Sequence, residues 1–285
     1  MVEILSPRSD VIFKLFFSDE RNIDLLTDFL KSTLDIPSDE YEEVTIADPN
    51  LLREYPEDKL GILDVKLRTK AGKIINIDIQ VSPIPAMESR IIFYGAKLIS
   101  EQIGKGEDYN NIKRVISVII TDYTLIEKSQ AYHHRFTMYD PANRVRFSDI
   151  FEINTLEIPK IPNDSDGTQL WNWLKFLDAR TEEDLYMIAE KNPEVKKAVA
   201  RLLELSADEK ARALYEAREK ERRDNLARER GAMREGMREG MREGMREGRL
   251  SVQIEIIKNA KQMGMSIEDI VKLTGLSREE VENVS

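Results

Sequence analysis

The feature that most constrains this fold is the stretch 61–82, GILDVKLRTKAGKIINIDIQVS, in which apolar and polar residues alternate on both sides of a short turn. Alternation with a period of two is typical of half-buried β-strands, and the glycine-containing turn at 70–73 predicts that the strands form a hairpin. One face is apolar throughout: Leu63, Val65, Leu67, Ile75, Ile77, Ile79 and Val81. The other face carries Asp64, Lys66, Arg68, Asn76, Asp78 and Gln80.

Two aspartates on the polar face create an electrostatic problem. If the turn centres on Ala71, Asp64 and Asp78 lie opposite each other with their Cβ atoms about 5 Å apart, where like charges are destabilising. A divalent cation between them would remove the repulsion. Gln80 shares this face and the backbone carbonyl of Ile79 lies between, so the stretch offers the hard oxygen ligands that Mg²⁺ prefers. From the pattern alone, a solvated sheet face and a metal site both remain open.

Composition narrows the class of protein. The 285 residues include no cysteine, which excludes disulfides, a thiol nucleophile and cysteine-ligated zinc or iron–sulfur sites. The net charge of -10 argues against a protein that coats DNA, so any contact with nucleic acid must be local and basic or assisted by metal ions. No run approaches ~18 apolar residues and the start lacks a secretory signal pattern, so we expect no membrane span and a cytoplasmic location.

The rest of the first half predicts helices and strands that would pack as layers. We expect helices at 9–17, 22–34 and 86–103, and strands at 43–47, 115–120, 131–139 and 144–147. Arg90 and Tyr94 lie on one side of the third helix. His133 and His134 are adjacent on a strand and point to opposite faces, so they are not expected to chelate one ion or to be catalytic. We expect one of them to be packed and the other exposed.

A loop at 163–167 precedes a helical second half. Residues 207–249 predict one long charged helix, in which the tetrad Met-Arg-Glu-Gly occurs four times over 233–248. Each glycine costs about 1 kcal/mol relative to alanine, so this helix is weak alone. Two interpretations remain open. The helix packs against a partner that approaches along the glycines, or it is a low-complexity tether of variable length.

The segment 252–285 predicts helix, turn, helix, with capping boxes starting at Ser266 and Ser277. The shape resembles a DNA-binding helix-turn-helix. However, Glu279, Glu280 and Glu282 against the single Arg278 make a poor helix for reading a DNA groove. We therefore favour a module that contacts protein.

The ordered motifs resemble the PD-(D/E)XK nuclease core. More closely, the chain is similar to the recombination-promoting nuclease family, often labelled putative transposases. The resemblance covers nearly the whole chain. It is carried by Asp10-x-x-Phe13-Lys14-x-x-Phe17, Ile62–Lys66, Ile75–Gln80, Arg90-x-x-x-Tyr94, Gln102 followed by Gly106–Tyr109, and the ending Gly264–Ser277.

The resemblance implies an α/β fold: a PD-(D/E)XK restriction-endonuclease-like core, with a mixed sheet flanked by helices, followed by an all-α tail. We divide the chain into a nuclease-like domain at 1–162, a helical extension at 168–205, the long charged helix at 206–249 and the C-terminal module at 250–285.

The resemblance also implies a site. Asp64 and Asp78 would bind Mg²⁺, or alternatively Mn²⁺ or Ca²⁺, together with the Ile79 carbonyl. Gln80 stands in place of the superfamily's lysine, and because an amide cannot act as a general base, it would orient the attacking water. Asp78 stands where the family more often has glutamate, so its carboxylate reaches about one methylene less far, and Leu63 replaces the motif's proline. Supporting roles fall to Asp10, Lys14, Arg90, Tyr94 and Gln102.

The implied function is a Mg²⁺-dependent DNA endonuclease that acts in recombination, on mobile elements or in defence. Its partners would be DNA and further copies of the chain, forming a homo-oligomer, most simply a dimer, through the helical tail. A rival hypothesis is a nuclease-fold assembly protein that has lost activity. A third is a regulator that binds DNA through its C-terminal turn.

Overall fold

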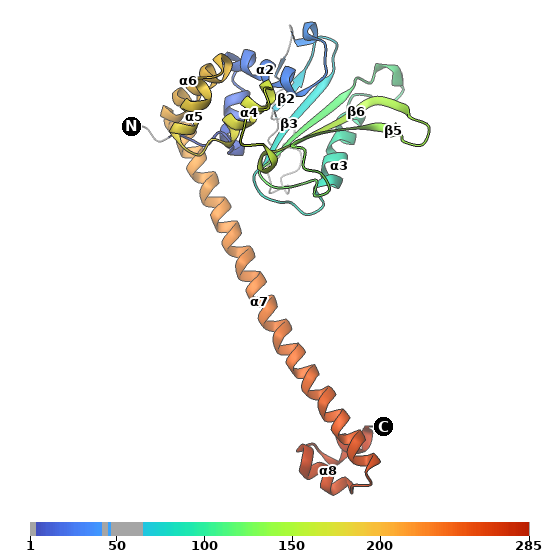
Figure 1. Ribbon diagram of the computed structural model, residues 1–285. Coiled ribbons are helices and arrows are strands. Elements are labelled where there is room, and N and C mark those ends of the chain that lie inside the picture. Colours follow the sequence, from blue (N-terminus) through green and yellow to red (C-terminus); the bar gives the residue numbers. More distant parts are fainter. Residues whose placement is uncertain (1–3, 42–44, 47–64, 285) are drawn as a thin grey trace. The chain divides into compact units, whose positions relative to one another are not determined.

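The structure is a computed structural model that describes residues 4–41, 45–46 and 65–284. The chain forms two compact units, residues 1–218 and 219–285, which we describe separately (Figure 1). The predicted segment boundaries at 162, 205 and 249 stay predictions.

The first unit is built on a mixed sheet whose strand order, over the described residues, is β1-β2-β3-β4-β6-β5. β3, β4 and β6 run parallel, whereas β1, β2 and β5 pair antiparallel with their neighbours. The strands are β1 Thr45–Ile46, β2 Val65–Arg68, β3 Ile74–Gln80, β4 Val115–Thr121, β5 His133–Asp140 and β6 Val145–Glu157. β4 is buried along its whole length, as its continuous β-branched sequence predicts.

The predicted hairpin is β2 and β3. Val65 pairs with Ile77 and Arg68 with Ile74, so the turn centres on Ala71 as predicted. Gly72 adopts a φ of 82°, in the left-handed region that glycine allows without strain. Asp64 lies outside the described residues. The prediction that Asp64 lies opposite Asp78 assumed a turn centred on Ala71, and the observed register has this turn.

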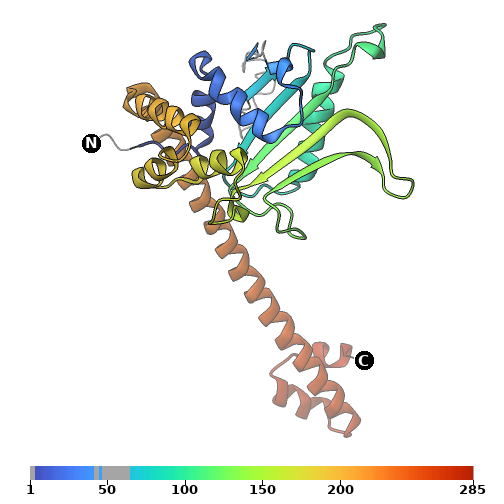
Figure 2. The same cartoon turned by 45° about the horizontal axis from the view of Figure 1, so that its top comes forward.

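Helices cover both faces of the sheet (Figures 1 and 2). One face packs against α3, through Met87, Ile91 and Leu98. The other face packs against the remaining helices of the unit. The helices are α1 Asp10–Phe17, α2 Ile23–Thr33, α3 Met87–Ser100, α4 Gln169–Asp178, α5 Glu182–Ala189 and α6 Pro193–Ala207. Short 3₁₀ turns occupy Glu20–Asn22, Ser38–Tyr41, Tyr109–Asn111 and Ile158–Lys160.

The largest core joins segments far apart in the sequence. Phe17 contacts Phe29 and Trp173 with ring centroids 5.7 and 6.1 Å apart, so α1, α2 and α4 meet at one aromatic cluster. The side chains of Thr168, Thr181 and Asn192 cap α4, α5 and α6 at their first turns. Helices of the second half of the chain therefore bury their apolar faces in the same core as the sheet.

α3 approaches the sheet closely at Gly95. A Cβ atom added there would lie 2.1 Å from Cζ of Phe151 on β6, which is far inside van der Waals contact. Gly104, just beyond the helix, has room for a methyl group, with its nearest neighbour atom at 3.5 Å.

Gly95→Ala is therefore expected to destabilise the first unit by about 1–3 kcal/mol, because the ring or the helix must shift. Both tryptophans lie in α4, so tryptophan fluorescence during urea unfolding reports on this unit. Gly104→Ala is the matched control and should change stability by less than about 0.5 kcal/mol. Equal stabilities of the two variants would contradict the close approach of α3.

The second unit contains the remainder of α7 Glu209–Gln262, followed by α8 Ile267–Thr274 and α9 Arg278–Asn283. α7 continues unbroken through Gln262, beyond the end at 249 predicted for the long charged helix. Ile257, Ala260, Ile270 and Val281 form a small core at its end. Ser277 and Glu280 form the predicted capping box, whereas at Ser266 the Asp269 carboxylate bonds the serine hydroxyl instead. Over the described part of the chain, no helix is long and apolar enough to cross a membrane.

Candidate active site

Asp78 and Gln80 lie near the carboxyl end of β3, on the sheet face that packs against α3. Asp78 is only 8% exposed and pairs with Ile119 in the centre of the parallel sheet. Gln80 Nε2 donates a hydrogen bond to Asp78 Oδ2 at 2.6 Å. Within the described chain, the Gln80 side-chain oxygen accepts no hydrogen bond, so it can accept one from a water molecule.

The backbone around Ile79 also offers an oxygen. The Gln80 carbonyl accepts a hydrogen bond from Asp122 N at 3.0 Å and so points toward β4. Because successive carbonyls of a strand point to opposite sides, the Ile79 carbonyl points toward β2. This is the side from which the predicted ligand Asp64 would come.

Tyr123 is a functional candidate that the sequence analysis missed. Its hydroxyl is buried. Burial and the negative charge of Asp78 raise the pKa of Tyr123, and a hydrogen bond with the Ile84 backbone lowers it, so the phenol is protonated at neutral pH. The preceding residue, Asp122, bonds the Gln80 carbonyl, which places Tyr123 beside the end of β3. No motif marks Tyr123, because it reaches the site only through the parallel pairing of β3 with β4.

Arg90 and Tyr94 lie on α3, with the Arg90 guanidinium carbon 5.3 Å from the centre of the Tyr94 ring. Met87 and Ile91 of α3 pack against Ile119, the strand neighbour of Asp78, so the first turns of α3 face this site. Gln102 lies elsewhere. Its amide bonds both the carbonyl and the N–H of Lys113, at 3.0 and 2.8 Å, and thereby ties the end of α3 to the segment before β4.

Asp10 and Lys14 lie on α1. The Asp10 carboxylate is bound by Arg218 of α7, with Nη2 and Nε at 2.6 and 2.7 Å from Oδ2. Ser9 occupies the N-cap position, but its side chain makes no capping hydrogen bond. The described contacts therefore place Asp10 in an ion pair between helices, while Lys14 is half-buried on α1.

The oxygen atoms that the described residues supply suit a hard divalent cation. Asp78, the amide of Gln80 and the Ile79 carbonyl supply oxygen atoms, the ligand type that Mg²⁺ prefers. Within the described ranges, no three acidic or histidine side chains gather closely enough to hold a metal ion. A complete site would require Asp64 from outside those ranges.

His133 and His134 point to opposite faces of β5, as predicted. The expectation that one is exposed is wrong, since both are half-buried. His133 Nε2 lies 3.1 Å from Asn154 Oδ1, and burial lowers the pKa of His133. His134 Nδ1 lies 3.5 Å from the carboxylate of the buried Glu157. The two histidines share no ligand site.

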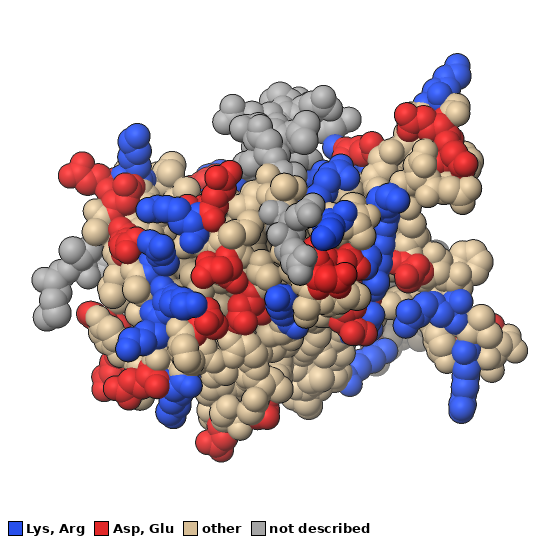
Figure 3. Space-filling model, turned by 90° about the horizontal axis from the view of Figure 1, so that it is seen from above, with Lys and Arg blue, Asp and Glu red and all other residues tan. Residues whose placement is uncertain are grey.

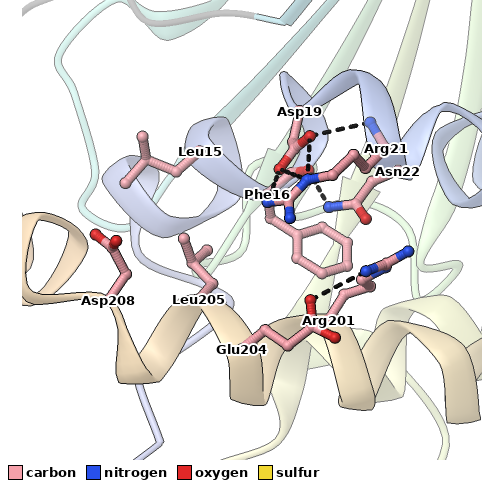
Figure 4. A pocket seen from close by; sticks show the side chains of 9 residues that line it. All are labelled: Leu15, Phe16, Asp19, Arg21, Asn22, Arg201, Glu204, Leu205 and Asp208. Carbon is pink, nitrogen blue, oxygen red and sulfur yellow. Dashed lines mark hydrogen bonds and ion pairs between the residues drawn. The ribbon is translucent and has the colours of Figure 1, made fainter.

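A separate pocket of about 240 Å³ lies between α1 and the end of α6 (Figure 4). Two ion pairs border it, Asp19 with Arg21 at 2.6 Å and Arg201 with Glu204 at 3.0 Å. None of the site residues predicted from the sequence lines this pocket. The remaining charged side chain, Asp208, accepts a hydrogen bond from Ala211 N at 2.8 Å. The pocket is therefore separate from the candidate active site.

Similarity to a known protein family agrees with this fold. The model of the family described as PD-(D/E)XK nuclease family transposase matches residues 7–231, or 225 of the 285 residues. No curated protein and no solved structure matches the chain. The family match confirms the family and the fold class that the resemblance implied. Because the matched range covers most of the chain and the entire described sheet, the chain belongs to the PD-(D/E)XK nuclease family transposases.

Proposed function

We propose that this protein is a Mg²⁺-dependent DNA endonuclease that hydrolyses phosphodiester bonds in recombination, on mobile elements or in defence. Family membership supports a nuclease. The observation that carries the proposal is the buried Asp78 carboxylate beside Gln80 at the carboxyl end of the parallel strands. A buried carboxylate is stabilised by hydrogen-bond donors and cations, and a divalent cation at Asp78 would be one such partner beside Gln80.

Asp64, Asp78 and the Ile79 carbonyl would hold the ion, with Mg²⁺ as the first choice and Mn²⁺ or Ca²⁺ as alternatives. When bound, such an ion polarises the scissile phosphate and stabilises the leaving oxygen. Asp64 directly precedes β2 in the sequence, and Ile79 lies in β3.

The chain's own residues would position the reactants. Gln80 donates to Asp78 and uses its oxygen to accept from, and so orient, the attacking water. The protonated Tyr123 hydroxyl can donate to a phosphate oxygen, and Arg90 can neutralise phosphate charge. Lys14 and Tyr94 are weaker candidates for the same task, while Asp10 and Gln102 act through the contacts described above.

Metal-dependent cleavage of supercoiled plasmid tests this proposal. The wild-type chain should nick or linearise plasmid with Mg²⁺ or Mn²⁺ and should be inactive with a chelator, and the Asp64→Ala/Asp78→Ala double variant should be inactive. A double variant that cuts as fast as wild type overturns the assignment.

An inactive assembly protein is the rival, favoured by Gln80, which removes the lysine that could act as a base. Calorimetric titration with Mn²⁺ separates the two hypotheses. An enzyme should bind the ion in a manner that depends on Asp64 and Asp78, whereas an inactive scaffold should show no such binding.

We further propose that the chain forms a dimer through α7, which would bring two active sites into one assembly and allow both strands to be cut. Met233, Met237, Met241 and Met245 are exposed along this helix. The glycines of the repeat, Gly236, Gly240, Gly244 and Gly248, have open space around them. A helix with this exposed stripe and low intrinsic stability is well suited to pack against a second copy.

Replacing these four glycines with alanine distinguishes a dimer from a tether. In a tether, each substitution should stabilise the helix by up to about 1 kcal/mol and leave the mass unchanged. In a dimer that packs closely along the glycines, added methyl groups should shift the equilibrium to monomer. Sedimentation equilibrium measures the mass and circular dichroism the helicity. A wild-type monomer at all concentrations would contradict the dimer.

A further inference from the structure

The hairpin formed by β5 and β6 extends beyond the body of the sheet (Figures 1 and 2). β6 begins at Val145 but pairs with β4 only from Phe151 to Glu157. Its first residues therefore pair with β5 alone, and residues 141–147 are all exposed. A two-stranded ribbon outside the core contributes little to stability, which points to another use for it.

The end of the hairpin has a defined shape. Asp140 Oδ1 accepts hydrogen bonds from the backbone of Ala142 and Asn143, and its Oδ2 accepts one from the Asn143 side chain at 2.6 Å. Arg144 has a φ of 55°, a left-handed conformation that non-glycine residues rarely adopt. A turn held this firmly would present its side chains in fixed directions.

The exposed side chains at this end combine positive charge with apolar surface. Phe147 is 85% exposed and Tyr139 and Val145 are about half exposed. Arg144 and Arg146 are exposed and, within the described chain, form no ion pair. Seen from above, the projecting end is mainly blue and tan (Figure 3). The two arginines and one aspartate of 139–147 give this segment a net charge of +1, in a chain whose total is -10.

This combination suits nucleic acid. Arginine binds phosphate oxygens with strong, charge-assisted hydrogen bonds. Exposed aromatic rings pack against bases and sugars, and some proteins insert such rings as wedges into a groove. A two-stranded ribbon is narrow enough to lie in a groove of duplex DNA. An acidic protein would satisfy the arginines but would not account for the nuclease core on which the hairpin is built.

The sheet links the hairpin to the candidate active site. Asp78 lies in one row of the sheet with Ile119 and Thr155. Thr155 pairs with His134 and Val145 pairs with Asp140, so six residue steps of β5, about 20 Å of strand, separate this row from the end of the hairpin. One turn of B-DNA is about 34 Å long. A duplex positioned at Asp78 and following the strand direction would therefore reach the hairpin within one helical turn of the cleaved bond.

We propose that the β5–β6 hairpin is a DNA-binding arm, in which Arg144 and Arg146 contact backbone phosphates and Phe147 packs against sugar and base edges. This proposal rests on the proposed function. Tyr139, which pairs with Arg146 across the ribbon, would support the same surface.

The test uses the full-length chain with Asp78→Asn, so that bound DNA is not cut, and follows the fluorescence anisotropy of a labelled duplex of about 30 base pairs. Arg144→Asn with Arg146→Gln should weaken binding about tenfold. It should also reduce the slope of log affinity against log salt by about 2, because each lost phosphate contact removes about 0.9. Asparagine is chosen because it tolerates the left-handed conformation.

Phe147→Ser should weaken binding at least about fivefold without changing the salt slope, because it removes packing and no charge. Lys191→Gln with Lys196→Gln is the charge-matched control, since both lysines are exposed on the helical side of the unit. This control should keep the DNA affinity and the salt slope of the Asp78→Asn parent. Circular dichroism and tryptophan fluorescence should show that every variant is folded.

The outcomes separate the two proposals. If wild type cleaves DNA but the hairpin variants keep the DNA affinity and salt slope of the Asp78→Asn parent, the DNA-binding arm alone is overturned. Equal losses of DNA affinity in the double arginine variant and the double lysine variant would also overturn the arm alone. If the Asp78→Asn parent binds no DNA and the wild-type protein cleaves none, both the nuclease proposal and the arm are overturned.

Discussion

Full-length protein carrying Asp78→Asn is expected to cleave plasmid at least about 10²–10³-fold more slowly than wild type, the range seen when one preorganised electrostatic group of an active site is removed. Asparagine keeps the shape of the side chain and can still bond the amide of Gln80. It removes the negative charge that would hold a divalent cation. The loss should therefore appear in catalysis and in metal binding, not in the fold.

Three measurements test this prediction. Initial rates of plasmid nicking give the catalytic loss, titration calorimetry with Mn²⁺ gives the loss of metal affinity, and urea unfolding checks the stability. Asp164→Asn is the control, because Asp164 is exposed in a loop before α4 and the substitution removes the same charge. A variant that binds Mn²⁺ and cuts like wild type would show that Asp78 does not belong to the active site.

Glu152→Ala is expected to destabilise the first unit by about 3–5 kcal/mol, the largest stability effect that we predict. Glu152 is 1% exposed on β6, and its carboxylate binds Arg114 Nη2 at 2.5 Å and Arg135 Nε at 2.8 Å. Asn154 Nδ2 donates to its other oxygen at 2.9 Å. Removing the carboxylate leaves the largely buried Arg114 guanidinium with much less compensation, whereas Arg135, whose side chain is 33% exposed, keeps its ion pair with Asp35.

Urea unfolding followed by tryptophan fluorescence measures this loss. Glu204→Ala is the matched control, since Glu204 forms an exposed ion pair with Arg201 on α6 and should cost no more than about 1 kcal/mol. Glu152→Gln should fall between the two, because it keeps the shape and loses the charge. Equal stabilities for the Glu152 and Glu204 alanine variants would contradict the importance of the buried network.

The destabilisation would also test how the hairpin is anchored. Glu152 joins Arg114, which precedes β4, to Arg135 of β5, so the network ties the base of the β5–β6 hairpin to the centre of the sheet. If the hairpin contacts DNA, Glu152→Gln should weaken DNA binding less than the arginine substitutions at its tip. The network acts on the base of the arm and leaves its contact groups in place.

Local patterns in the sequence determine much of the first unit. The alternation in 65–80 predicts the β2–β3 hairpin, its register and the common face of Asn76, Asp78 and Gln80, because side chains of a strand must alternate. The capping serines Ser266 and Ser277 predict where α8 and α9 begin, because a cap satisfies N–H groups only a few residues away. The family follows from the order of such motifs and not from any one of them.

Contacts between distant segments were decided only by the tertiary structure. Parallel pairing of β3 with β4 brings Tyr123 to Asp78, and nothing within a few residues of Tyr123 encodes that neighbour. The extension of β6 to thirteen residues, the pairing of Asp10 with Arg218 and the burial of Trp173 beside Phe17 are of the same kind. Asp78 and Gln80 could be placed on one face from the sequence because residues two positions apart in a strand point to the same side. The arm, the buried Glu152 network and the Tyr123 hydroxyl depend on which strands become neighbours, and that choice is made by burial of the whole apolar core.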